Sequence, residues 1–234
     1  MANKHWSHSE VNHTSGLSEK SLLAYRFRGY LPVVIDIETG GFNAQTDAIL
    51  EIAATTLEMD DDGTLHIKQT HAFDVDPFEG ANLDSDSLAF TGIDPFDPKR
   101  AAESEETVFN ELFRFVRREV KNNHCKRAIL VAHNASFDHQ FLNAAIQRTK
   151  IKRSPFHPFS SMDTATLAGF AYGHTVLAQA CRIANIPFDS SSAHSAAYDA
   201  EVTAQLFCQI VNQWRDYGGW AKAERGLRSI VQDE

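Results

Sequence analysis

Hydrophobic residues recur along the first third of the chain with the spacing of β-strands. The run Val33–Ile35 is apolar and β-branched and leads into Asp36, which is typical of a buried strand. Residues 48–57 and 65–75 predict two further strands, and residues 58–63 (EMDDDG) predict the turn between them. Because the strands follow one another through short connections, the first three are expected to form an antiparallel meander.

The rest of the chain changes mainly to the helical period. A helix is expected from about Ser104 to Lys121, where apolar residues recur every three or four positions. The short apolar segment Ala128–Ala132 predicts an internal parallel strand. Three strands followed by helix–strand–helix indicate an α/β fold with a mixed sheet. Other helical segments are expected at residues 87–90, 137–148, 163–171, 175–184 and 196–213.

Composition places the chain among globular proteins of one domain. It has 234 residues, of which 43% are hydrophobic and 10% aromatic. Its three cysteines are scattered without a C-x-x-C pair, so neither a disulfide framework nor a zinc site is indicated. No apolar run is long enough to span a membrane, and a soluble cytoplasmic protein is expected. Residues 1–21 are polar and predict a flexible extension before a domain at 22–234.

Charge is distributed unevenly along the chain. The net charge is −9, which by itself argues against a nucleic-acid partner. Between Arg114 and Arg153, however, ten basic residues face only two acidic ones, so this segment carries +8 and the remainder −17. Such a basic block can bind a polyanion, although a solvated helix face explains several of its members equally well.

Two carboxylates follow the first predicted strand. Asp36 and Glu38 lie two residues apart, so both point to one face of the sheet, and Gly40-Gly41 ends the strand directly afterwards. Buried acids without a partner are costly, and a bound cation would explain the pair. The alternative is a strand whose last residues emerge into solvent.

Two other stretches supply further acids and a histidine. Asp138 follows the apolar strand at the start of a helix, where a helix-start acid is the ordinary explanation. Asp199 lies on the apolar face of the last long helix, where the alternative to a metal is a salt bridge to an arginine. His194 precedes that helix, in a loop or first turn, and histidine suits the role of general base near neutral pH.

Four carboxylates and one histidine form a site of hard oxygen ligands. Such a site favours Mg²⁺ or Mn²⁺ over zinc. Two ions about 3.5–4 Å apart can activate water and stabilise the leaving oxygen of a phosphodiester. An ATPase is excluded as an explanation of the acidic strand, because the chain contains no G-x-x-x-x-G-K-[ST] phosphate loop.

The motifs DIETGGF, HNASFD and HSAAYD resemble the three exonuclease motifs of the DEDDh superfamily, in its histidine-containing branch. The stretches RFRGY, GGFNAQTDAILEIAA, LAFTGIDP and SPFHPF extend the resemblance to the ribonuclease T family, from about Leu22 to the end of the chain. The resemblance implies a ribonuclease-H-like fold, with a mixed five-stranded sheet flanked by helices. It also implies a 3′→5′ exoribonuclease that trims tRNA, rRNA and other stable RNA precursors and acts on single-stranded DNA.

The resemblance assigns roles to particular residues and to a homodimer. Two Mg²⁺ ions, with Mn²⁺ as an alternative, would be held by Asp36, Glu38, Asp138 and Asp199. His194 would be the general base and would also approach one metal. The terminal bases would stack on Phe42, Phe90, Phe137 and Phe159, and a basic patch of one subunit would feed RNA to the other subunit's site. That patch would comprise Arg26, Arg28, Lys121, Arg127 and Lys152.

This chain departs from the family pattern at two positions, and two other functions stay open. Gly41 stands where alanine is common, and Asp86 stands where glutamate is common near the base pocket. A proofreading exonuclease of a DNA polymerase would keep the acids without needing a dimer patch. A non-catalytic nucleic-acid-binding module of the same fold would not need all four acids and the histidine.

Overall fold

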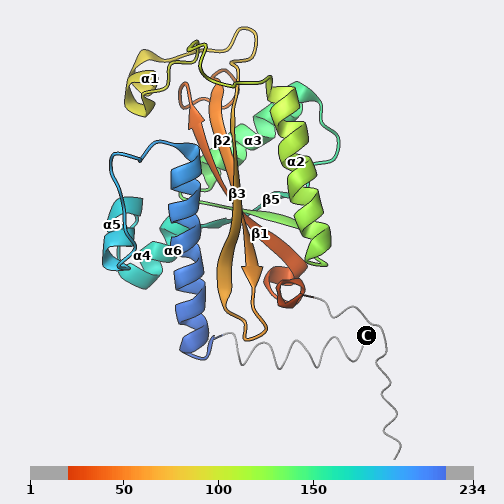
Figure 1. The fold of residues 1–234 in the computed structure, drawn as a ribbon, viewed down its shortest axis with the longest axis vertical. Coiled ribbons are helices and arrows are strands. Elements are labelled where there is room, and N and C mark those ends of the chain that lie inside the picture. Colours follow the sequence, from red (N-terminus) through yellow and green to blue (C-terminus); the bar gives the residue numbers. More distant parts are fainter. Residues whose placement is uncertain (1–20, 220–234) are drawn as a thin grey trace, which may run out of the picture.

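A mixed five-stranded sheet forms the centre of the fold, in the order β3-β2-β1-β4-β5 (Figure 1). The computed structural model describes residues 21–219, so the extension expected at residues 1–21 lies outside this range except for Ser21. The first three strands form the expected antiparallel meander, and β4 runs parallel to β1. The strands are β1 Tyr30–Thr39, β2 Ile49–Met59, β3 Leu65–Asp74, β4 Arg127–Ala132 and β5 Phe156–Asp163.

The fifth strand was implied by the family resemblance but was not located in the sequence. β5 pairs in parallel with β4 at the edge of the sheet, with an irregular register between Ala128 and Leu130. Pro158 lies within β5 and cannot donate a backbone hydrogen bond, which an edge strand tolerates because one of its sides is unpaired. The proline and the serines that follow it break the apolar alternation by which a strand is recognised.

Helices cover both faces of the sheet (Figure 1). α2 and α3 pack on one face, and α6, supported by α4 and α5, packs on the other. Every helical segment expected from the sequence is confirmed. The helices are α1 Ser85–Thr91, α2 Glu105–Asn122, α3 Ser136–Thr149, α4 Thr164–Tyr172, α5 Leu177–Ile183 and α6 Ala196–Asp216, with short 3₁₀ turns at Leu22–Ala24 and Phe27–Gly29.

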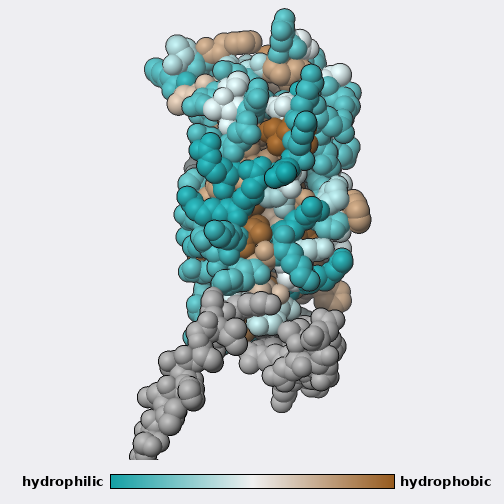
Figure 2. All heavy atoms as spheres, turned by 90° about the vertical axis from the view of Figure 1, so that its right-hand side faces the viewer, coloured by the Kyte–Doolittle hydropathy of each residue, from teal (hydrophilic) through white to brown (hydrophobic). Residues whose placement is uncertain are grey.

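β1 is the strand most deeply enclosed by these layers. The side chains of Leu31 to Ile35 face fully buried rings of α2 and α6, among them Phe109 and Phe207. Burial of each such side chain contributes about 1.5–3 kcal/mol. The outer surface over α2 is mostly hydrophilic, with hydrophobic side chains visible only in small separate spots (Figure 2). Among residues 21–219, no helix has both the length and the apolar character needed to cross a membrane.

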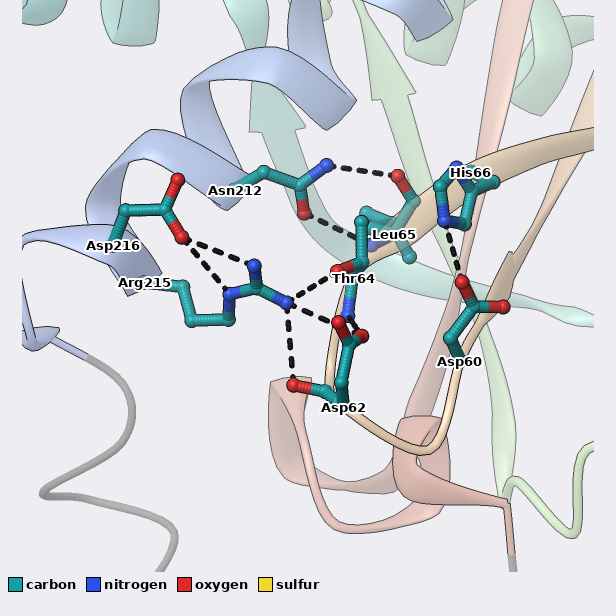
Figure 3. A network of polar contacts seen from close by, with 8 residues as sticks. All are labelled: Asp60, Asp62, Thr64, Leu65, His66, Asn212, Arg215 and Asp216. Atoms are coloured by element: carbon teal, nitrogen blue, oxygen red, sulfur yellow. Dashed lines mark hydrogen bonds and ion pairs between the residues drawn. The ribbon is translucent and has the colours of Figure 1, made fainter.

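α6 is fastened to the β2–β3 hairpin near its C-terminal end (Figure 3). The Asn212 amide accepts the Leu65 N–H and donates to the Leu65 carbonyl, both at 2.9 Å. One turn later, the Arg215 guanidinium donates to Asp62 and to the Thr64 hydroxyl and pairs with Asp216 at 3.0 Å. These contacts set the direction of the helix, whose other end carries Asp199.

We expect Asn212→Ala to lower the free energy of unfolding by about 1–3 kcal/mol, because it leaves the Leu65 N–H and carbonyl without partners. Gln205→Ala, an exposed position of the same helix, is the matched control and should change stability little. Urea denaturation of both variants measures the difference. Equal stability of the two variants would show that the hairpin contact does not stabilise the fold.

Candidate active site

Four carboxylates from three elements meet at the C-terminal end of β1. Asp36 and Glu38 lie on β1, Asp138 lies in the first turn of α3, and Asp199 lies in the first turn of α6. β1 and β4 are parallel, so their carboxyl ends lie on the same side of the sheet. α3 follows β4 and therefore begins near the end of β1. Glu38, Asp138 and Asp199 are each at least nine-tenths buried.

Crowding of these acids disfavours their charged forms. Burial raises the pKa of Asp36 well above its ordinary value, and the charges of Asp138, Glu38 and Asp199 raise it further. Burial, followed by the charges of Asp199 and Glu51, raises the pKa of Glu38 to about 7. Burial also raises the pKa of Asp138, although its own N–H and that of Ile37 oppose the rise. The cluster therefore carries more negative charge than the protein alone can stabilise.

His194 lies beside the acids in the turn before α6, as the sequence led us to expect. Its backbone has φ 71° and its N–H donates to Asp199 Oδ2 at 2.8 Å. Its exposed ring lies 4.2 Å from the ring of Phe90. Burial raises the pKa of Asp199, while the N–H of His194 and the nearby imidazoles lower it.

The donor set fits a divalent cation. Glu38, His194 and Asp199 each offer one ligand atom, and these atoms lie within 4.8 Å of one another. Carboxylate oxygens with one imidazole nitrogen suit hard divalent ions, and a cation would offset the repulsion that raises the pKa of the acids.

Glu51 is a fifth acid of this region that the sequence analysis did not identify. It lies on β2 directly opposite Glu38, and its Oε2 accepts the N–H of Ala196, the first residue of α6, at 3.1 Å. Burial raises the pKa of Glu51, and that hydrogen bond opposes the rise. Glu51 thus fixes the start of α6 beside β1. An acid within the apolar stretch AILEIAA indicates a buried carboxylate that needs a partner. The partner, the N–H of Ala196, could not be named from the sequence because it depends on strand register.

Three of the four candidate stacking phenylalanines are exposed to solvent. Phe42 is 84% exposed, Phe90 68% and Phe159 79%, whereas Phe137 is half-buried. The ring of Phe137 lies 6.3 Å from that of Phe42. Phe90 contacts His194, and Phe159 contacts the ring of His157 at 4.5 Å. The structure therefore brings Phe42 and Phe90 to the acids, whereas Phe159 lies beside His157, which lines the pocket of Arg127 and Lys152. Exposed aromatic rings at these places indicate a binding surface rather than a core.

The five candidate cations of the basic patch lie in different surroundings. Arg127 and Lys152 line one pocket of about 620 Å³. Arg28 lies over the ring of Tyr30, which contacts His157 of that pocket, and Lys121 is exposed near the end of α2. Arg26 is buried and lines another pocket, where burial and then Arg215 lower its pKa to about 10. Arg117, Lys126 and Arg153 also line the first pocket.

Solved structures share this fold at low sequence identity. The nuclease domain of 3′hExo, described as a DEDDh family member bound to rAMP, aligns with a TM-score of 0.63 and 19% identity, over 78% of this chain and 92% of that domain. Exonuclease I of E. coli in complex with a dT13 oligonucleotide aligns with a TM-score of 0.61 and 15% identity, over 82% of this chain and 43% of that one. At these identities the likeness concerns the fold.

Sequence comparison is more specific. Residues 33–207 match the family model RNase_T, described as exonuclease. A ribonuclease T of Hahella chejuensis is 60% identical over 201 residues, which are 86% of this chain and 92% of that protein. A ribonuclease T of Shewanella sp. strain ANA-3 is also 60% identical, over 88% of this chain and 93% of that protein. The chain therefore belongs to the RNase T family of exonucleases.

Proposed function

We propose that this protein is a cytoplasmic 3′→5′ exoribonuclease that trims the 3′ ends of tRNA, rRNA and other stable RNA precursors and also degrades single-stranded DNA. One observation carries the proposal: the exposed rings of Phe42 and Phe90 lie beside the buried acids. Phe42 follows the acids of β1 by four residues, and the ring of Phe90 contacts His194. The similarity to proteins named ribonuclease T supports the choice of RNA.

The phenylalanines would bind the end of a single strand. An unpaired base can insert between or upon aromatic rings, with a gain of about 1–3 kcal/mol per base and little dependence on sequence. Phe42, Phe90, Phe137 and Phe159 would stack on the terminal bases, whereas bases paired in a duplex would not reach the rings. Stacking of this kind would restrict binding to unpaired ends, and the choice of the 3′ end follows the similarity to ribonuclease T.

The acids would hold the metals and orient the reacting groups. Asp36, Glu38 and Asp199 would bind two Mg²⁺ ions, which Mn²⁺ could replace, and Asp138 would complete the site. When bound, these ions lower the pKa of the attacking water and stabilise the leaving oxygen. His194 accepts the proton of that water as its oxygen attacks phosphorus, and the bond to the 3′ oxygen of the preceding nucleotide breaks. The hydrogen bond to Asp199 holds the His194 backbone in place.

The position of the basic pocket supports a homodimer. Arg127 begins β4 and lies opposite Tyr30, whereas the acids lie at the other end of β1. Six residues of strand separate Tyr30 from Asp36, about 20 Å along the sheet. A phosphate backbone held by Arg127 and Lys152, with Arg28 and Lys121 nearby, would thus lie away from the acids of its own subunit, which is compatible with a patch that serves a partner's acids. Arg26, the fifth residue of the proposed patch, is buried and lines a different pocket, so its contribution would be indirect.

Loss of a metal-binding acid or of the base should nearly abolish activity. We expect Asp199→Asn and His194→Ala each to lower kcat by about 10²–10⁴-fold, because a cation ligand or the proton acceptor is lost. The assay follows a 5′-labelled single-stranded RNA with and without Mg²⁺, alongside Glu201→Gln, an exposed acid on the same helix, as control. Near-normal activity of either variant with an intact fold would overturn the mechanism.

The metal-free protein should become less stable as the pH rises. Because the pKa of Glu38 is about 7 in the fold against an ordinary value of 4.5, the folded protein binds more protons than the unfolded chain between these values. Stability from Glu38 is therefore present at low pH and lost towards pH 7, by about 3 kcal/mol. Asp36 and Asp138 act in the same direction.

Thermal unfolding in EDTA at pH 5 and pH 8 measures this effect, and Mg²⁺ should restore more stability at pH 8 than at pH 5. Glu38→Gln is the matched control and should weaken the dependence on pH. The same melting temperature at both pH values for the metal-free protein would contradict the expected repulsion among the acids.

Mixing of variant subunits tests whether the basic patch of one protomer serves the acid cluster of the other. We expect the double variant Arg127→Ala/Lys152→Ala to raise KM and to reduce the salt dependence of binding, since two phosphate contacts are lost. Mixed with the inactive Asp199→Asn protein, it should regain activity, because a mixed dimer pairs one intact patch with one intact acid cluster. If activity does not exceed the sum of the separate proteins, each patch serves its own subunit.

A further inference from the structure

Two segments that carry exposed phenylalanines lie side by side although they are far apart in sequence. The connection between β1 and β2 carries Phe42, and the segment from Asn82 into α1 carries Phe90. The Asn82 N–H donates to the Thr46 carbonyl at 2.8 Å, and the Asp84 N–H donates to the Gly40 carbonyl at 2.7 Å. The two segments therefore form one unit at the mouth of the acid cluster.

The side chain of Asp47 joins the two segments. It is 5% exposed, and its Oδ2 accepts the Asn43 N–H at 2.9 Å. Its Oδ1 accepts the Thr46 hydroxyl at 2.7 Å and the Asn82 side-chain amide at 3.1 Å. Burial alone would raise the pKa of Asp47, but these hydrogen bonds outweigh it and hold the pKa below its ordinary value. The group is thus an ionised carboxylate surrounded by donors.

Gly41 allows the carboxylate to approach this closely. Its φ of 159° is a conformation that residues with a side chain rarely adopt, and the space beside it is also restricted. A Cβ added at Gly41 would lie 2.0 Å from Asp47 Oδ2, far inside van der Waals contact. An alanine at this position would displace either the carboxylate or the loop that carries Phe42.

We propose that Asp47 is a positioning residue. It fixes Phe42 relative to Phe90 and so preorganises the binding site for the terminal bases. This inference rests on the proposed binding of a 3′ end by these rings. Asp47 itself does not touch the bases in this arrangement. Its effect passes through the Asn43 N–H to the loop of Phe42, and through Asn82 to α1 and Phe90. Because the Phe90 ring contacts His194, the same fixation extends to the histidine.

The test compares RNA with and without terminal bases. The substrates are a 12-nucleotide single-stranded RNA and the same RNA whose two 3′-terminal nucleotides lack their bases. In Asp47→Asn the amide nitrogen faces a donor in either orientation: the Asn43 N–H if it takes the place of Oδ2, and the Asn82 side-chain amide if it takes the place of Oδ1. We expect KM for intact RNA to rise about tenfold, KM for the abasic RNA to stay unchanged, and kcat to fall much less.

Two further variants make the result specific. Asp62→Asn, which changes a carboxylate that accepts the Thr64 N–H in the β2–β3 turn (Figure 3), is the matched control and should leave both KM values unchanged. Asn82→Ala removes one hydrogen-bond donor to Asp47. It replaces Asp47→Asn in the test if that variant does not fold.

The outcomes separate the inference from the proposed function. If the wild-type protein binds intact and abasic RNA equally, the stacking function itself is wrong. If the wild-type protein discriminates between them and Asp47→Asn discriminates equally well, the role of Asp47 is overturned. An equal rise of KM on both substrates would also overturn it, since that indicates general damage to the site.

Discussion

Repulsion among buried carboxylates at the end of β1 is the constraint around which the rest of the structure is arranged. The pKa of Asp36, Glu38, Asp138 and Asp199 is raised in each case, chiefly by burial. Backbone N–H groups offset part of the cost, because Asp138 accepts from Ile37 and Asp199 accepts from His194. Hydrogen bonds of this kind stabilise single charges but cannot neutralise the whole cluster. Protons or a divalent cation must supply the remainder.

The fold prevents the acids from moving apart to relieve this repulsion. β1 lies between β2 and β4 and its apolar side chains from Leu31 to Ile35 are buried, so the backbone that carries Asp36 and Glu38 is held in place. α6 is held near both ends, by Asn212 on Leu65 and by Glu51 on the N–H of Ala196. Since burial of the apolar core exceeds the electrostatic cost, the protein keeps a site that is unfavourable without a cation.

The sequence predicted those features that depend on local periodicity and on motif spacing. The first four strands and all the helices were recoverable because apolar residues recur regularly in them, and the acids because each stands next to such an element. β5 escaped because Pro158 interrupts its pattern. Glu51 and Asp47 escaped because their partners, Ala196 and Asn82, are set by strand register and loop packing. Arg26 looks like a surface cation in sequence, yet the fold buries it.

The start of α6 shows how one carboxylate can serve two purposes at once. A helix leaves its first N–H groups without intrahelical partners, and an acid placed there is favoured by the helix dipole. Asp199 uses Oδ2 to hold the N–H of His194, and Glu51 takes the N–H of Ala196. Because a carboxylate has two oxygens, Asp199 can fix the histidine with one and offer the other to a cation. Glu51 therefore caps the first turn of α6 while Asp199 holds the backbone of His194, and the two carboxylates together tie the order of the loop before α6 to the acid cluster.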